Sequence, residues 1–420
     1  MMPVLIVTFL VLLLLAVPVG HVLVIASGAA ISTSEFLPYN IIIQQLFGPS
    51  QSFPMLALPF FILAGGLMMS GTLGQHLVDF ATVLVQRYRG GLASVSVLGS
   101  ATIGGVSGSA VADATSMGSI LIPWQKREGY PAGFVAANNA ATSMIAVLIP
   151  PSIPMILYSL VSGVSIGGLF LAGVLPGLMI TAVFILVCNL SARFRNFPYN
   201  RVPFDWARFW PLLAKASPAL LLPVLILVLL RFGIATPTEV SVLATLYALL
   251  MGVLVYRDLT LSAFVKAVLA AGVSTGVVML VIMGSTVVAW LVTFAQVPQA
   301  FAAWCLETLQ DPWAIILVLN LIMLLVGMFI DLPAAILLLG PIFVPLAKEI
   351  GLDPMQLGIM MVLNLSIGLF TPPVGTTLFI SSTIAKVPVL KVVKELWPYY
   401  LGALIVLALF SYVPVLTLKF

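Results

Sequence analysis

Long apolar segments recur along the whole chain and are separated by short polar connections. Many are near or above the roughly 20 residues that cross about 30 Å of hydrocarbon. The apolar–polar alternation that marks a membrane β-barrel is absent. The pattern therefore predicts an all-α polytopic membrane protein. We expect crossings at about 3–31, 53–70, 132–168, 170–190, 212–232, 236–256, 274–296, 355–385 and 396–417.

The first apolar segment is similar to a signal-peptide core, but no Lys or Arg precedes it. Its apolar run continues through Pro18 and Gly20 to about Ile31. We therefore expect an uncleaved first helix that crosses the membrane.

Two apolar segments are predicted not to cross. Residues 92–125 lie between two basic clusters, so the chain enters and leaves on the same side, and "GGVSGSAVAD" divides them. Each half, about 15 residues, reaches only about 22 Å. Residues 313–347 have the same form, with "VGMFIDLP" at the tip, but follow an acidic connection. Both are predicted to be re-entrant helical hairpins that enter from opposite faces.

An internal repeat relates the two halves of the chain at an offset of 222 residues. The offset carries Gly105, Gly118, Pro123, Gly129, Pro150, Pro151 and Pro176 onto Gly327, Gly340, Pro345, Gly351, Pro372, Pro373 and Pro398. We therefore divide the chain into repeat one (1–200), a connecting loop and helix (201–235) and repeat two (236–420). Each repeat contains one hairpin and one proline-broken helix, at 132–168 and 355–385. The polar-tinged stretches 75–90 and 297–311 are predicted to be interfacial arms.

Charge predicts the orientation of the repeats. The short connections that carry most basic residues are predicted to be cytoplasmic. These residues are Arg87, Arg89, Lys126, Arg127, Arg193, Arg195, Arg201, Arg208, Arg257, Lys266, Lys386, Lys391 and Lys394. The connections around Glu35, Glu307 and Asp311 lack Lys and Arg, which suits the opposite face. The repeats are thus expected to have inverted topology, as in secondary transporters.

Composition agrees with this class and excludes several others. Hydrophobic residues make up 62% of the chain and charged residues 7%, and the net charge of +4 is spread over loops, which does not indicate nucleic-acid binding. Cys188 and Cys305 have no metal-like spacing and imply no disulfide framework. No Walker A motif exists. "GVSG" at 105–108 matches the motif of intramembrane serine proteases, but the two histidines, His21 and His76, lie in other segments. We expect neither an enzyme nor a cofactor.

The segments "LIPPSIP" and "FTPPVGT" interrupt helices at membrane depth. Proline has no N–H, so nearby carbonyls lose their helical donors. These carbonyls belong to Ala146, Val147, Pro150, Gly368 and Leu369. Together with the hydroxyls of Ser152, Thr371, Thr376 and Thr377 they would form a neutral oxygen nest suited to sodium. The alternative for a single copy is an ordinary proline kink, and the repeat favours the cation site.

The hairpin tips supply further candidates. Ser109 and Asp113 lie at the first tip, and Asp331 lies at the second. An acid at membrane depth suggests a function in coupling or substrate binding, but each Asp could instead cap a hairpin half-helix. The repeat pairs Asp113 with Ala335, so the two acids are not equivalent.

Polar residues just before the breaks are the candidates for substrate contact. They are Asn138, Asn139, Thr142, Ser143 and Asn364. They would line a central cavity or, as is commoner, hydrogen-bond between helices.

With these residues assembled, the sequence resembles the large membrane (M) subunit, of the DctM and SiaM kind, of the tripartite ATP-independent periplasmic (TRAP) transporters. The segments that carry the resemblance are "LPFFILAGGLMMSG", "GSAVADATSMGSILIP", "IPPSIPMILYSLVSGVSIGGLFLAGVLPGLM", "TPTE", "GMFIDLPAAILLLGPIFVPLAKEIGLDP" and "SIGLFTPPVGTTLF". The resemblance implies an elevator mechanism, similar to that of the ion-transporter superfamily, in which hairpins and broken helices carry an organic acid with sodium.

The resemblance also implies sites and partners. Sodium site one would comprise Ser107, Ala110, Ile149, Ser152 and Pro154, and site two Gly327, Thr371, Val374 and Thr377. The implied partners are a small four-helix membrane subunit (Q), expected as a separate chain, and a periplasmic substrate-binding protein (P). We expect sodium-coupled import of a carboxylate or sugar acid across the bacterial inner membrane. The alternatives are a proton-coupled carrier and a non-transporting channel or structural subunit.

Overall fold

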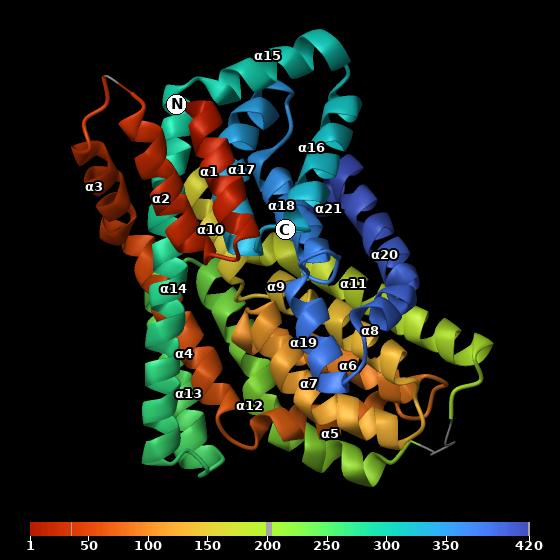
Figure 1. The fold of residues 1–420 in the computed structure, drawn as a ribbon. Coiled ribbons are helices and arrows are strands. Elements are labelled where there is room, and N and C mark those ends of the chain that lie inside the picture. Colours follow the sequence, from red (N-terminus) through yellow and green to blue (C-terminus); the bar gives the residue numbers. More distant parts are fainter. Residues whose placement is uncertain (35, 199–203, 419–420) are drawn as a thin grey trace.

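The computed structural model describes residues 1–34, 36–198 and 204–418. Glu35 and Arg201, which contributed to the charge pattern, lie outside the described residues. Within these ranges the secondary structure is helical throughout, as expected, and no strand occurs (Figure 1). The helices are α1 (Met2–Leu14), α2 (Val19–Ser32), α3 (Asn40–Phe47), η1 (Gly48–Gln51), η2 (Phe53–Leu56), α4 (Ala57–Met69), α5 (Leu73–Val85), α6 (Gly91–Ser107), α7 (Ala110–Arg127), α8 (Ala132–Thr142), α9 (Ile145–Leu148), α10 (Ile153–Ser162), α11 (Ile166–Phe194), α12 (Trp206–Arg231), α13 (Pro237–Leu250), η3 (Met251–Val255), α14 (Leu261–Phe294), α15 (Val297–Leu309), α16 (Pro312–Gly327), α17 (Leu332–Glu349), α18 (Pro354–Gly368), α19 (Thr376–Ala385), α20 (Val389–Tyr412) and α21 (Val415–Leu418).

Several of these helices are long and apolar enough to cross a membrane. Among the described residues there are six such helices, or up to eight if each bent pair counts as one crossing. The chain is therefore a multi-pass membrane protein.

Helix bounds follow the offset of 222 residues. The offset carries α7 onto α17 residue for residue, and it brings α6, α8, α10 and α11 to within a few residues of α16, α18, α19 and α20. In Figure 1, α5, α6 and α7 lie at one end of the molecule, and α15, α16 and α17 lie toward the other. The contacts are reciprocal as well, since α4 packs on α13 and α14 packs on α2.

The first apolar segment forms two helices instead of the expected single crossing. α1 ends where Ala16 adopts a left-handed conformation with φ of 57°. The N–H of Val17 then donates to the carbonyl of Leu12 (3.1 Å), a Schellman-type ending. Pro18 starts α2, which packs beside α1. The prediction of one helix over 3–31 is therefore wrong, because an apolar run does not reveal a left-handed turn.

The second crossing, expected at 53–70, is formed by η2 and α4, and a bend precedes it. α3 and α4 are separated by η1 and η2, and the chain bends by 64° there. Pro49 and Pro54 lie within the bend, where proline interrupts helical hydrogen bonding. The equivalent stretch of the second half, α14, is an uninterrupted helix of 34 residues, about 51 Å long.

Both predicted hairpins consist of two short helices joined by a tight turn. α6 and α7 contain 17 and 18 residues and are about 26 and 27 Å long. Their turn requires Gly108, whose φ is +59°, and Ser109 then caps α7 by accepting from the N–H of Ala112 (3.4 Å). α16 and α17 form the second hairpin, and Asp331 precedes α17.

The arm stretches form α5 and α15. The start of α5 is fixed to the loop before α14, because the Asp258 carboxylate accepts from the backbone N–H (2.6 Å) and the hydroxyl (2.8 Å) of Thr72. Tyr256 of the same loop stacks on His76 and donates to the carbonyl of Lys215 (2.7 Å).

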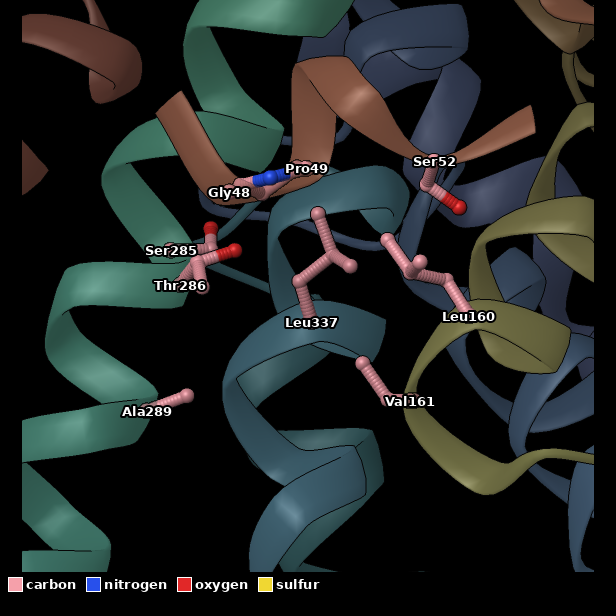
Figure 2. A pocket seen from close by; sticks show the side chains of 9 residues that line it. All are labelled: Gly48, Pro49, Ser52, Leu160, Val161, Ser285, Thr286, Ala289 and Leu337. Carbon is pink, nitrogen blue, oxygen red and sulfur yellow. The ribbon is translucent and has the colours of Figure 1, made fainter. Parts of the chain in front are cut away.

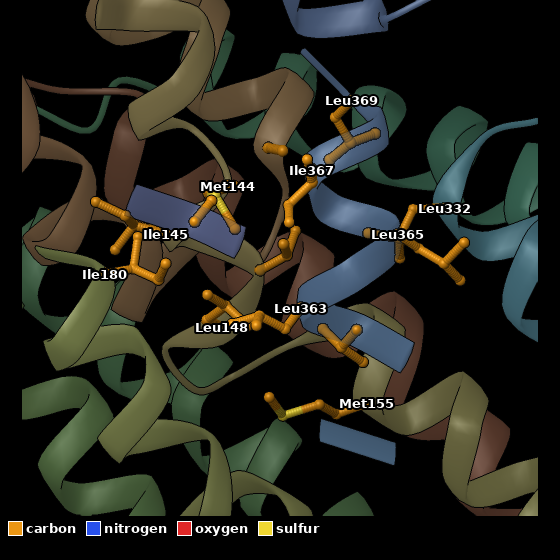
Figure 3. Packing of buried hydrophobic residues seen from close by; sticks show 14 of the residues in the cluster. Met144, Ile145, Leu148, Met155, Ile180, Leu332, Leu363, Leu365, Ile367 and Leu369 are labelled. Atoms are coloured by element: carbon orange, nitrogen blue, oxygen red, sulfur yellow. The ribbon is translucent and has the colours of Figure 1, made fainter. Parts of the chain in front are cut away.

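The two broken helices form the centre of the molecule. α19 packs against α8, and α10 packs against α18. Figure 3 shows apolar side chains from both broken helices gathered around the breaks, including Met144, Leu148, Leu363 and Leu365, all of them buried. This apolar packing fixes the breaks relative to each other.

Candidate functional site

The first break lies between α9 and α10, where the helix axis bends by 49°. Ile149 and Ser152 are extended, and the Pro150–Pro151 peptide between them is cis. The Ser152 hydroxyl donates to the carbonyl of Val147 (2.5 Å). The expectation that this carbonyl lacks a donor is therefore wrong, because the chain turns back far enough for the hydroxyl that caps α10 to reach it.

The tip of the first hairpin closes over this break. A β-carbon on Gly108 would lie only 2.4 Å from the carbonyl oxygen of Pro151, and one on Gly104 would lie 2.6 Å from the α-carbon of Ala146. The tip thus brings Ser107 and Ala110, at the ends of α6 and α7, beside the break. The residues of predicted sodium site one, Ser107, Ala110, Ile149, Ser152 and Pro154, are therefore gathered in one place.

The second break has the same construction. A β-carbon on Gly368 would lie 2.2 Å from the carbonyl oxygen of Gly327, so the hairpin tip again meets the broken helix backbone to backbone. The N–H of Val374 donates to the carbonyl of Met328 beside that tip (3.2 Å). Thr371 lies at the same break and donates its hydroxyl to the carbonyl of Ile367 (2.7 Å).

Two carbonyls at the second break that were expected to be free accept hydrogen bonds. The carbonyl of Gly368 accepts from the N–H of Thr371 (3.0 Å), and that of Leu369 accepts from the N–H of Thr377 (3.0 Å). The Thr377 hydroxyl lies between the carbonyl oxygens of Leu369 (2.9 Å) and Ala140 (3.0 Å), and so joins both broken helices. The prediction of unpaired carbonyls is wrong for these two, because the chain makes a tight turn at Thr371 and the first turn of α19 then folds back over the break.

The two acids occupy different positions. Asp113 lies in the first turn of α7, fully buried, and its carboxylate accepts from the Ser100 hydroxyl of α6 (2.7 Å). It does not cap α7, because Ser109 holds that position. Asp331 does occupy the N-cap position of α17, although its side chain makes no capping bond, and it corresponds to Ser109 at the offset of 222. The prediction that each Asp caps a hairpin half-helix is thus wrong for Asp113. Asp331 does lie at the N-cap position, but without a capping hydrogen bond.

The asparagines connect helices. Asn138 donates to the carbonyl of Ala93 (2.9 Å) and accepts from the hydroxyl of Tyr399 (3.0 Å). Asn139 donates to the carbonyl of Ala114 and to the hydroxyl of Ser381, both at 2.9 Å. Asn364 donates to the side-chain oxygen of Asn320 (2.8 Å). The interhelical alternative describes Asn138 fully, whereas Asn139 and Asn364 each keep one side-chain oxygen without a donor in the described chain.

Several buried side-chain oxygen atoms of the hairpins and broken helices have no hydrogen-bond partner in the described chain. Within the described residues they include Ser107 Oγ, Asp113 Oδ1, Asn139 Oδ1, Asn364 Oδ1 and Thr376 Oγ1. Such atoms are costly in a protein interior unless another group satisfies them. All are hard oxygen ligands, so this part of the protein suits a small alkali cation.

A cavity of about 580 Å³ adjoins the first tip. Ser107, Ser109 and the hydroxyl residues of α7 form one wall. Gly65 and Gly66 of α4 form the other with α14, which contributes Ala267, Ala270, Ala271 and Ser274. The predictions from the sequence did not include the hydroxyl residues of the α7 wall. The spacing of Thr115, Ser116 and Ser119, which places them on one helical face, is the signal that was available. The predictions also omitted Ser100 and Asn320, which face their partners only after folding.

Comparison with known proteins agrees with this architecture. Residues 6–416 match the family described as the tripartite ATP-independent periplasmic transporter, DctM component. The chain is 54% identical to the uncharacterized protein y4mL of Sinorhizobium fredii, with 99% of each chain covered. It is 38% identical to the C4-dicarboxylate TRAP transporter large permease protein DctM of Pseudomonas aeruginosa, which covers 89% of this chain and 87% of that protein. It is 36% identical to the sialic acid TRAP transporter large permease protein SiaM of Vibrio cholerae, over 97% and 95%.

A solved structure shares the fold. The crystal structure of the Alcanivorax borkumensis YdaH transporter, described as having an unusual topology, superposes with a TM-score of 0.62. The superposition covers 97% of this chain and 98% of that one at 18% sequence identity. The match to the family model and the three relatives place the protein more closely: the chain belongs to the DctM family, the large permease subunits of TRAP transporters.

Proposed function

We propose that the chain is the translocating subunit of a sodium-coupled importer of organic anions. The observation that carries the proposal is the pair of proline breaks, each closed by a hairpin tip and each with a buried oxygen that lacks a hydrogen-bond partner, Ser107 Oγ at the first and Thr376 Oγ1 at the second. Sodium would bind at the two sets of residues named above for site one and site two. Unwound backbone and half-helix ends serve this purpose in other secondary transporters.

The cavity supports an anionic cargo that travels with cations. Its described lining residues include hydroxyls but neither Lys nor Arg. An organic anion in so neutral a site needs a positive charge nearby, because burying an uncompensated charge is costly. Sodium at the adjoining break would supply it. Relatives named for C4-dicarboxylate and sialic acid support a carboxylate or sugar acid as the cargo.

We infer an elevator-type movement of the hairpins and broken helices against α2, α4, α13 and α14. α17 packs along α14, whereas the 580 Å³ cavity separates its counterpart α7 from α4 and α14. The basic loops at the base of α6 and α7 support a cytoplasmic position for this end. The structure would then be the inward-facing state, with residues 1–200 and 236–420 as inverted repeats joined by 201–235.

The proposed partners follow from the family. They are a small Q subunit as a separate chain and a periplasmic binding protein that delivers the cargo at the bacterial inner membrane. The first half of α14 exposes Leu261, Val265, Leu269, Val273 and Val277 at intervals of four residues. A stripe of this kind suits lipid or an apolar partner helix.

Uptake by liposomes that contain the chain with its Q subunit tests the function. We expect uptake to require both a sodium gradient and the cognate binding protein. Substrate-independent conductance would instead support the alternative of a channel subunit.

The proton-coupled alternative predicts a role for the acids. We expect a sodium gradient alone to drive uptake in Asp113→Asn and Asp331→Asn, because neither carboxylate belongs to the proposed cation sites. Initial rates measured under a sodium gradient and under a pH gradient check this. Uptake that a pH gradient drives in the wild-type protein and no longer drives in either variant would favour proton coupling instead.

A further inference from the structure

A second, smaller cavity lies further along α10 and α14 than the larger one. It measures about 290 Å³ and is lined by η1, α10, α14 and α17 (Figure 2). Its polar lining residues are Ser52, Ser285 and Thr286, and Leu337 forms the hairpin wall. In Figure 2, Ser285 and Thr286 project from α14 toward Gly48 and Leu337.

The two cavities are counterparts in the repeat. The offset of 222 carries Gly48, Pro49 and Ser52 onto Ala270, Ala271 and Ser274, all of which line the larger cavity. The same offset carries Thr115 of the larger cavity onto Leu337 of the smaller one. Four pairs of equivalent positions therefore line the two cavities. The smaller cavity is the counterpart of the larger one in the other repeat.

The hydroxyls lie on opposite walls in the two cavities. Thr115, Ser116 and Ser119 line the larger cavity from its hairpin, but their equivalents on α17 are Leu337, Leu338 and Pro341. Conversely, Ser285 and Thr286 line the smaller cavity from α14, and their equivalents on α4 are Leu63 and Ala64. The smaller cavity therefore presents its hydroxyls on the long helix rather than on the hairpin.

Ser285 stands out among these residues. It is 99% buried, since its exposed fraction is 1%, and its Oγ has no hydrogen-bond partner in the described chain. Thr286, by contrast, donates to the carbonyl of Ile282 (2.9 Å). A buried hydroxyl that faces a cavity without a partner costs free energy unless something in the cavity satisfies it.

We infer that the smaller cavity is the outer binding site for the organic anion, and that Ser285 donates a hydrogen bond to a carboxylate or hydroxyl oxygen of the anion as it arrives from outside. The inference rests on the proposed function, because it takes the cargo and its direction from there. It adds a specificity-determining residue on α14, outside both proposed sodium sites.

Kinetics of Ser285→Ala provide the first test. In liposomes with the Q subunit and binding protein, we expect the KM for uptake to rise about three- to tenfold, the value of one hydrogen bond, with kcat little changed. Ser241→Ala is the matched control, because Ser241 of α13 is also a buried serine but already donates to the carbonyl of Thr238. An unchanged KM in Ser285→Ala, or an equal rise in Ser241→Ala, would overturn the inference.

Thiol labelling provides a second test that needs no transport. The native Cys188 and Cys305 are buried, so the wild-type protein serves as the blank. We expect an anionic, membrane-impermeant methanethiosulfonate to label Thr286→Cys, whose position in the smaller cavity is only partly buried, from the outer face, and Ser274→Cys from the face of the basic loops. Labelling of both variants from the same face contradicts the assignment of two cavities. A wild-type protein without sodium-dependent uptake refutes the proposed function instead, and leaves the labelling result interpretable.

Discussion

Replacement of Gly108 by alanine is expected to reduce sodium-dependent uptake strongly. Gly108 has φ of +59°, and an added β-carbon would lie 2.4 Å from the carbonyl oxygen of Pro151. The conformation alone costs about 1–2 kcal/mol with a β-carbon. The clash must also push the hairpin tip away from the break and so separate Ser107 from Ser152. Because 1.4 kcal/mol of lost ion binding is a factor of ten, we expect uptake at a fixed sodium concentration to fall at least about tenfold.

Gly163→Ala is the matched control for this prediction. Gly163 has φ of +74°, but no neighbouring atom lies within 4 Å of the added β-carbon. We expect this variant to lose only a little thermal stability and to retain sodium-dependent uptake. Thermal unfolding in detergent and uptake in liposomes are measured for both variants. Similar uptake by the two variants would show that the seating of the tip on the break does not matter for transport.

Replacement of Thr377 by valine is expected to weaken the sodium dependence of uptake. The hydroxyl lies between the carbonyl oxygens of Leu369 and Ala140, at 2.9 and 3.0 Å. Valine keeps the shape of threonine but removes this oxygen from the second break. The loss of one buried polar partner costs about 1–3 kcal/mol. We therefore expect the sodium concentration for half-maximal uptake to rise about tenfold or more.

Thr377→Ser separates ligand chemistry from packing. Serine restores the hydroxyl without the methyl group, so we expect sodium dependence close to that of the wild-type protein and a modest loss of stability. Thermal unfolding of both variants provides the comparison. If Thr377→Val unfolds at a lower temperature while its sodium dependence stays unchanged, the hydroxyl is a structural bridge between the broken helices and not part of a cation site.

Features that depend on the length of apolar segments and on the positions of Gly, Pro and charged residues could be predicted from the sequence. The hairpins, the proline breaks and the offset of 222 follow from segment length, Gly and Pro positions, and charge. The meeting of Gly108 with Pro151 could be expected because the repeat and the tip motifs both indicated close backbone approach. The sodium-site residues that the family motifs imply lie at the hairpin tips and the breaks, and their role in ion binding stays a prediction.

Features that depend on a single backbone turn or on a distant partner could not be predicted. The break at Ala16 arises from one left-handed residue inside an apolar run. The carbonyls of Val147 and Leu369 accept from residues that reach them only when the chain folds back. Ser285 could not be identified as a candidate from the sequence, because its lack of a hydrogen-bond partner is a property of the folded chain. In each case the decisive contact is absent from local composition.

The hydroxyl face of α7 has a consequence for motion. Thr115, Ser116 and Ser119 each donate to a carbonyl of their own helix, those of Val111, Ala112 and Ser116. Each of these hydroxyl groups therefore keeps its hydrogen bond whether water or another part of the protein lies opposite. The facing surface of α4 and α14 consists mainly of glycine and alanine, which permits close approach. In the proposed elevator movement this face would be a sliding surface, wetted when the cavity opens and sealed when it closes, with the donors of Thr115, Ser116 and Ser119 paired in both states.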